Sequence, residues 1–170
     1  MGELQLWPMA NQRPDFEGNP TETILRATWR HMVEEGKEKW VFYDGSVQTE
    51  DEWLAYIRDP SVGPVFVIDA DEKEIRAVVW INQYRDQIAQ GHFCILGKWD
   101  PRIGKLIHAY WQKLGLILVY GIVPEVNERA LAAMAEIGWQ TAGQIPKTCN
   151  LFYEARRVAG VLIYFDLEEV

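Results

Sequence analysis

Residues 118–143 read LVYGIVPEVNERALAAMAEIGWQTAG, and this stretch decides the fold. Residues 116–123 are almost uniformly apolar, which is typical of a strand that is covered on both faces in the middle of a sheet. A helix is predicted over residues 127–137, and Gly138 ends it because glycine tolerates the left-handed backbone that often follows a helix. The stretch therefore predicts an interior strand that leads directly into a helix.

The residues before this stretch predict a run of strands and one more helix. Strand character recurs over residues 64–69, 75–84 and 88–96, with turn residues between them, which indicates an antiparallel meander. Asp100-Pro101 then predicts the cap and first turn of a helix that ends at Gly115. The apolar residues of this helix keep helical spacing throughout: Ile103, Leu106, Ile107, Tyr110, Trp111 and Leu114.

Two further helices are predicted nearer the N-terminus. Asn19-Pro20-Thr21-Glu22 supplies a cap, a proline at the first helical position and an acidic residue in the first turn, so a helix should run from there to about Gly36. Residues 49–52 form a capping box, Thr-Glu-Asp-Glu, which opens a shorter helix that ends at Asp59-Pro60. Between the two helices, residues 39–43 are expected to form a short strand.

The order of elements predicts an α+β, or mixed α/β, domain. Residues 140–157 and 160–167 are expected to form two final strands that join near Val158-Ala159. A central, mostly antiparallel sheet of six to seven strands should then carry helices on both faces. We expect residues 1–170 to form a single domain with an irregular N-terminal segment over residues 1–18.

The composition narrows the classes of partner. The chain has 25 Asp and Glu against 17 Lys and Arg, a net charge of -8, which argues against a domain that binds nucleic acid through its phosphates. The acidic balance favours a cationic partner such as an amine or a basic peptide, although it is also common in proteins that are merely soluble. No signal peptide and no membrane-spanning stretch is apparent, so a cytoplasmic location without a membrane partner is expected.

The two cysteines do not indicate a disulfide bond or a metal site. Cys94 and Cys149 lie far apart in the sequence, without a second cysteine or a histidine at metal-ligand spacing. Neither a disulfide framework nor a metal is therefore expected, and both thiols are interpreted as reduced and buried.

The order of elements resembles that of the GNAT superfamily of coenzyme-A-dependent N-acetyltransferases, as a degenerate member. The family shows a strand, an Asn that opens a helix, a Gly-aromatic pair and a later Gly. Here these are Asn127, Gly138-Trp139 and Gly143. The resemblance covers the chain from about Pro64 to the C-terminus.

The resemblance implies acetyl-CoA as co-substrate. In the family, the fourth strand lies along the pantetheine arm, and the following helix N-terminus binds the pyrophosphate, which suits an anion because the first amides of a helix are unpaired. Lys98, Arg102 and Lys105 would add positive charge, although such cations can also simply solvate a helix start. The implied cofactor-binding residues are Ile95, Leu96, Gly97, Lys98, Arg102, Ile103, Gly104, Lys105 and Asn127.

Two departures from the family pattern bear on activity. The phosphate-binding loop lacks its usual glycines in either register of Gly104, and a side chain in those positions could obstruct the phosphate. Met134 occupies the position of the usual tyrosine acid, and methionine cannot donate a proton.

The candidate catalytic residues come from the predicted strands. His92 is the one titratable side chain in the family's base-bearing strand, and an imidazole titrates near neutrality. Tyr84 and Tyr120, on neighbouring strands, could supply the acid. Cys94 lies near the expected thioester, where it could relay the acyl group or simply pack as a small apolar side chain.

Two functions remain open at this point. One is an acetyl-CoA-dependent N-acetyltransferase, a transferase of the acyltransferase class, that acts on a primary amine of a small molecule or peptide by direct acetyl transfer. The other is a non-catalytic GNAT-fold protein that serves as an interaction or CoA-sensing module. A homodimer is among the expected partners. The high tryptophan content, including Trp7, Trp29, Trp40 and Trp53, could serve an interface or fill the core.

Overall fold

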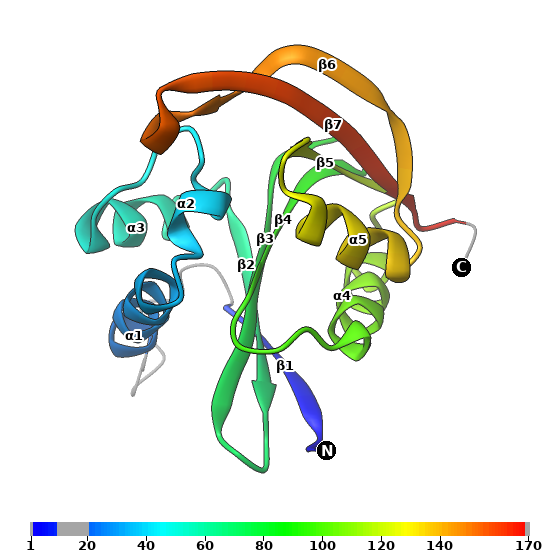
Figure 1. Ribbon diagram of the computed structural model, residues 1–170. Coiled ribbons are helices and arrows are strands. Elements are labelled where there is room, and N and C mark those ends of the chain that lie inside the picture. Colours follow the sequence, from blue (N-terminus) through cyan, green and yellow to red (C-terminus); the bar gives the residue numbers. More distant parts are fainter. Residues whose placement is uncertain (1, 10–20, 169–170) are drawn as a thin grey trace.

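One sheet of seven strands carries the fold of the described part of the chain. The computed structural model describes residues 2–9 and 21–168. Within these residues the strands are ordered β1-β2-β3-β4-β5-β7-β6 (Figure 1). The strands are β1 Leu4–Pro8, β2 Gly63–Asp69, β3 Glu74–Arg85, β4 Ile88–Ile95, β5 Leu118–Pro124, β6 Gln140–Leu151 and β7 Arg156–Asp166.

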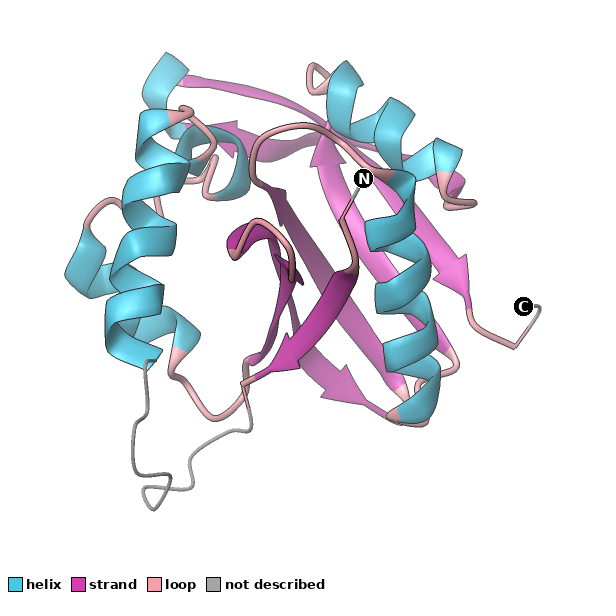
Figure 2. Cartoon of the chain, turned by 90° about the horizontal axis from the view of Figure 1, so that it is seen from below, coloured by secondary structure: helices cyan, strands magenta, loops and turns pink. Residues whose placement is uncertain are grey.

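Helices cover both faces of this sheet, as Figure 2 shows. On one face lie α1 Thr21–Glu34, α2 Glu38–Val41 and α3 Glu50–Ile57, and on the other lie α4 Pro101–Lys113 and α5 Glu128–Glu136. A short 3-10 helix, Phe152–Glu154, separates β6 from β7. No described helix has both the length and the apolar character needed to cross a membrane.

Each face of the sheet has its own core, because successive strand residues point to opposite sides. Val65 and Val79 pack with Trp111 of α4 in the core on the α4 and α5 side. Phe66 and Trp80 point the other way, into the core beneath α1 to α3. Trp29 and Trp53 belong to this second core, whereas Trp7 and Trp40 are exposed.

The predicted helix starts are confirmed by their caps. Thr49 and Glu52 form the reciprocal capping box of α3. The Asp100 carboxylate accepts a hydrogen bond from the Arg102 N–H at the start of α4, and Asn127 caps α5 in the same way. Helix α1 is present from Thr21, while Asn19 and Pro20 lie outside the described residues.

The sheet is antiparallel except at one place. Strands β4 and β5 pair in parallel over only three residues each, 88–90 and 118–120, although the strands have eight and seven residues. Beyond these pairs the two strands part. This opening in the sheet positions the candidate site.

Two sequence predictions about local structure are wrong. Residues 39–43 do not form a strand, because α2 forms a turn of helix over residues 38–41 in the layer of α1 and α3 (Figure 1). The final strands join at residues 152–155 rather than near Val158-Ala159, since Val158 is buried and pairs with Cys149. The turn places Ala155 in the left-handed region, at φ 50°, where no glycine or asparagine marks it in the sequence.

The N-terminal segment also differs from its expectation. Within the residues expected to be irregular, Leu4–Pro8 form edge strand β1, paired antiparallel with β2. Leu4 and Leu6 pack against the core, and Pro8 is tolerated because it ends a strand at the edge of the sheet.

Candidate functional site

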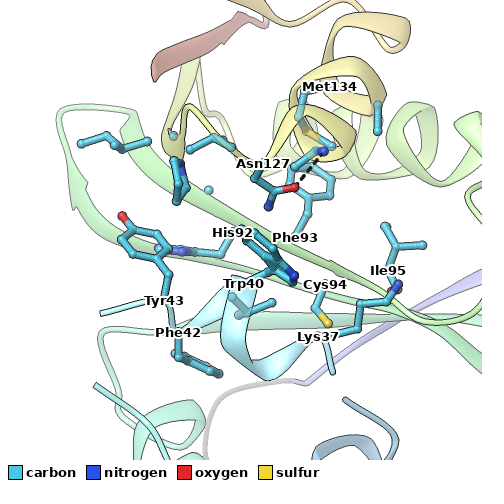
Figure 3. A pocket seen from close by; sticks show the side chains of 18 of the residues that line it. Lys37, Trp40, Phe42, Tyr43, His92, Phe93, Cys94, Ile95, Asn127 and Met134 are labelled. Carbon is cyan, nitrogen blue, oxygen red and sulfur yellow. Dashed lines mark hydrogen bonds between the residues drawn. The ribbon is translucent and has the colours of Figure 1, made fainter. Parts of the chain in front are cut away.

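A cleft of about 770 Å3 opens where β4 and β5 part (Figure 3). Its walls are residues 91–95 of β4, residues 121–124 of β5, the first turns of α5, and the chain on either side of α2. Asn127 points into it from α5, where its Oδ1 accepts a hydrogen bond of 3.2 Å from the Ala130 N–H. The site is thus built by elements that lie far apart in the sequence.

Of the residues expected to be catalytic or to bind the cofactor, three line this cleft: His92, Ile95 and Asn127. The other sequence candidates do not line it: Tyr84, Leu96, Gly97, Lys98, Arg102, Ile103, Gly104, Lys105 and Tyr120.

One end of the cleft, here called the α4 end, is lined by Glu35, Lys37 and Ile95, and Gly97 follows just beyond the lining residues. The Leu96 N–H donates to the Arg76 carbonyl of β3, so by strand alternation the backbone groups of Ile95 point away from β3 and toward the cleft. The Lys37 ammonium donates to the Ile95 carbonyl at 3.0 Å. The Gly97 N–H donates to both oxygens of the Glu35 carboxylate, each at 3.0 Å.

The Glu35 carboxylate is held ionised in this arrangement. Burial opposes its ionisation, but the Gly97 N–H and the Lys37 ammonium, 3.6 Å away, keep its pKa below the ordinary value. The side chains between α1 and α2 therefore already satisfy the backbone edge that the sequence assigned to a ligand.

The start of α4 is satisfied by its own residues as well. The Arg102 guanidinium donates to Asp100 at 2.6 Å and to the Gly2 carbonyl at 3.2 Å. The hydrogen bond from Arg102 lowers the pKa of Asp100. Arg102 is therefore committed to the cap of its own helix, while Lys98 and Lys105 are exposed.

Gly104 has a packing role that the sequence did not reveal. A Cβ at this position would lie 2.4 Å from Cδ1 of Ile137, so the missing side chain lets α4 approach the end of α5. Ile103 and Leu96 are buried in the two cores. These three residues support the walls rather than face a ligand.

The opposite end, here called the α3 end, comprises Asp44, Tyr56, Asn82 and His92, all of which line the cleft. The His92 ring stacks on Trp80 at 5.2 Å between centroids, and its Nε2 lies 3.2 Å from Oδ1 of Asn82. In the tautomer that donates this bond, Nδ1 keeps its lone pair. Burial lowers the pKa of His92 to about 4, against the opposing charge of Asp44, so the imidazole is neutral at neutral pH.

Tyr56 is a residue of the site that the sequence analysis missed. Its hydroxyl oxygen accepts hydrogen bonds from Trp80 Nε1 at 3.0 Å and from Asn82 Nδ2 at 3.2 Å. Burial raises the pKa of Tyr56 despite both bonds. In the sequence, Tyr56 belongs to the apolar face of a short helix, so no signal separated it from core residues.

The remaining chemical candidates are Tyr84 and Tyr120, which do not line the cleft, and Cys94 and Met134, which do. Tyr84 is 59% exposed, and the Tyr120 hydroxyl donates to Oε1 of Gln83 at 3.0 Å. Burial raises the pKa of the Cys94 thiol to about 12, which leaves it protonated and argues against an acyl relay. Met134 is buried at the cleft wall, so the position of the family's tyrosine carries no proton donor.

Comparison with solved structures finds the same architecture. The chain superposes on the spermidine N-acetyltransferase from Vibrio cholerae, solved in complex with CoA and spermine, with a TM-score of 0.69 and 18% identity over 97% of this chain and 96% of that one. It matches the ribosomal-protein-S5-alanine acetyltransferase from Vibrio fischeri with a TM-score of 0.71 and 10% identity, covering 99% and 96% of the two chains.

Comparison by sequence finds no match: no family model and no curated protein matches the chain. At this level of identity the similarity concerns architecture. The chain has the GNAT fold, here a seven-stranded sheet with one short parallel pairing.

Proposed function

We propose that this chain is an acetyl-CoA-dependent N-acetyltransferase that transfers an acetyl group directly to a primary amine. The cleft between β4 and β5 carries the proposal, since it extends from the first turn of α5 to the His92 imidazole. The similar spermidine N-acetyltransferase, solved with CoA and spermine, supports a CoA donor and an amine acceptor for this fold.

The residues of the cleft fit an extended pantetheine arm with an anionic end. In β4, residues whose backbone groups bond to β3 alternate with Phe93 and Ile95, whose backbone groups point away from β3. The backbone of Phe93 and Ile95 can therefore hydrogen-bond to such an arm as it would to a neighbouring strand. The Gly97 N–H already holds an anion, the Glu35 carboxylate, in the place where a phosphate would compete for it. Lys37 and Arg129 line the cleft and supply positive charge.

Acetyl-CoA would supply a thioester whose carbonyl carbon bonds to the amine nitrogen as the carbon–sulfur bond breaks. In this proposal, His92 accepts at Nδ1 the proton that the attacking nitrogen loses. Its lowered pKa keeps the imidazole neutral throughout the neutral range, and the negative charge of Asp44 favours the imidazolium once the proton has moved.

Tyr56 and Asn82 act in this scheme as positioning residues. Tyr56 accepts the Asn82 amide hydrogen, which turns the Asn82 carbonyl oxygen toward His92 Nε2. The leaving thiolate resembles that of cysteine, with a pKa of about 8.5, so it can depart without the family's tyrosine. Correct orientation of the two substrates then supplies much of the rate.

A specific observation also favours the second function, a non-catalytic module that senses CoA or binds a partner. Glu35 and Lys37 occupy the backbone edge at the α4 end, and Met134 stands where a proton donor is usual. A protein of this kind would bind CoA or a partner without turnover.

Titration calorimetry with acetyl-CoA, followed by assay of CoA thiol release with a panel of primary amines, separates these functions. Ala130→Phe, which fills the cleft at α5, should abolish acetyl-CoA binding, whereas Ala132→Phe, exposed on the same helix and outside the cleft, should not. Circular dichroism checks that both variants fold. Binding with release supports the transferase, binding without release supports the sensing module, and no binding by the unaltered protein overturns both CoA-dependent functions.

A further inference from the structure

The chain between α2 and α3 gives the cleft a distinctive surface beside His92. Trp40 of α2, and Tyr43 and Asp44 just after it, all line the cleft. Figure 3 shows Trp40 and Tyr43 on the side of the cleft opposite Asn127 and Met134, with His92 between the two sides. These residues would meet whatever approaches the imidazole.

Among the described residues that line the cleft, one carboxylate lies at the α3 end. Three of the described residues that line the cleft carry a carboxylate: Glu35, Asp44 and Glu128. Glu35 is bound to Gly97 and Lys37 at the α4 end, and Glu128 belongs to the first turn of α5, outside the α3 end. The charge of Asp44 acts on both His92 and Tyr56, whereas that of Asp59, which is not among the lining residues, acts on Tyr56 alone of the two.

Asp44 keeps an oxygen for a ligand. Its Oδ1 accepts the Ser46 N–H at 3.1 Å, which fixes the carboxylate in a turn. Among the described residues, Oδ2 makes no hydrogen bond or ion pair. One ammonium group can therefore pair with this carboxylate.

The rest of the surface is aromatic or neutral. Trp40 is 41% exposed at the cleft, which leaves much of its indole ring uncovered. Ring faces attract an ammonium group and also pack against an apolar chain. Gln83 and Gln90 add amide groups but no charge.

We propose that the acceptor is a monoamine with an apolar or aromatic body, whose ammonium pairs with Asp44 and whose body packs on Trp40 and Tyr43. The inference rests on the proposed function and narrows its substrate class. A diamine or polyamine would bring a second ammonium into an end of the cleft where the described lining residues offer it ring faces but no second carboxylate, and the rings compensate its lost hydration less than a carboxylate would.

Hexylamine and 1,6-diaminohexane test this inference, because they share one chain length and differ by one ammonium group. We expect kcat/KM to be about tenfold higher for hexylamine with acetyl-CoA as donor. Asp44→Asn should raise KM for hexylamine about tenfold with a smaller effect on kcat. Trp40→Ala should raise KM for both hexylamine and 2-phenylethylamine, because both bodies would pack on this ring. Glu34→Gln, an exposed carboxylate outside the cleft, serves as the matched control, and melting curves check that each variant folds.

Equal or better use of the diamine would overturn the inference and leave the proposed transferase standing, as would an Asp44→Asn variant that behaves like Glu34→Gln. If no amine releases CoA, the proposed function fails instead. Calorimetric titration of the two amines then still tests the inference. Tighter binding of hexylamine than of the diamine, weakened by Asp44→Asn, supports the inference, and equal binding of the two amines overturns it.

Discussion

The two ends of the cleft differ in whether their polar groups are hydrogen-bonded within the protein. At the α4 end, the cleft-facing carbonyl of Ile95 accepts a hydrogen bond from Lys37, and the N–H of the neighbouring Gly97 donates to Glu35, so both groups are bound by side chains of the same protein. At the α3 end, His92 Nδ1 and Asp44 Oδ2 have no partner among the described residues. Polar groups that stay unpaired beside a cavity point to chemistry there, whereas paired groups must first be released by a competing ligand.

The largest effect is expected from His92→Gln, which tests the α3 end directly. Glutamine keeps a polar side chain of similar size but accepts no proton, so kcat/KM for amine acetylation should fall about 100-fold or more. The Kd of acetyl-CoA should change by less than about twofold. His31→Gln, an exposed histidine of α1, is the control, and a His92→Gln variant with full activity would exclude the imidazole as the base.

His108 sharpens the comparison because it is a second histidine with a pKa lowered by burial to about 4, yet it lies in the core. Its Nε2 accepts the Trp139 indole N–H at 3.0 Å, so the folded state holds it neutral. In the unfolded chain a histidine has a pKa near 6.5, so on acidification the unfolded state binds the proton at a higher pH than the folded state does. The contribution of neutral His108 to stability is therefore present above pH 6.5 and is lost as the pH falls toward 4.

We therefore expect His108 to account for up to about 3 kcal/mol of acid destabilisation between these pH values. His108→Gln keeps an acceptor for Trp139 but cannot bind the proton, so its unfolding free energy should depend less on pH. Denaturant unfolding at pH 7 and pH 5 measures the difference. Identical pH dependence in the two proteins would contradict the assignment.

A smaller effect is expected at Gly104, near the α4 end. Gly104→Ala should lower the unfolding free energy by about 1 to 2 kcal/mol, because the added methyl group meets Ile137. In an Ile137→Ala background the same change should become neutral or stabilising, since alanine favours a helix over glycine. Loss of acetyl-CoA binding without loss of stability would instead indicate a ligand-contacting glycine.

The smallest effect is expected from Glu35→Gln, which tests whether the contacts at the α4 end can be displaced. The amide binds Gly97 N–H less strongly and carries no charge to repel phosphate, so acetyl-CoA should bind about fivefold more tightly. Glu34→Gln, the neighbouring exposed carboxylate, controls for the general loss of charge. Weaker binding in Glu35→Gln alone would mean that Glu35 supports the ligand instead of competing with it.

Sequence reasoning located the framework of the site better than its chemistry. His92, Ile95 and Asn127 were identified from strand order and a helix cap, and all three line the cleft. Arg102 was assigned to a ligand, but it pairs with Asp100 two residues away. A positive charge at a helix start does not say which anion it meets.

The missed residues make contacts over long sequence distances. Lys37 and Ile95 are 58 positions apart, Glu35 and Gly97 are 62 apart, and Tyr56 and Asn82 are 26 apart. No local pattern encodes these distances, so Lys37, Glu35 and Tyr56 look like ordinary helix or loop residues in the sequence.

The sequence by itself determined the helix starts at Thr49, Asp100 and Asn127 and the interior strand before α5, because caps and apolar periodicity act over a few residues. Only the tertiary structure decided where β4 and β5 part and which side chains face the gap. That outcome depends on how helices from opposite faces pack against one sheet, and packing brings together residues whose separation along the chain carries no signal.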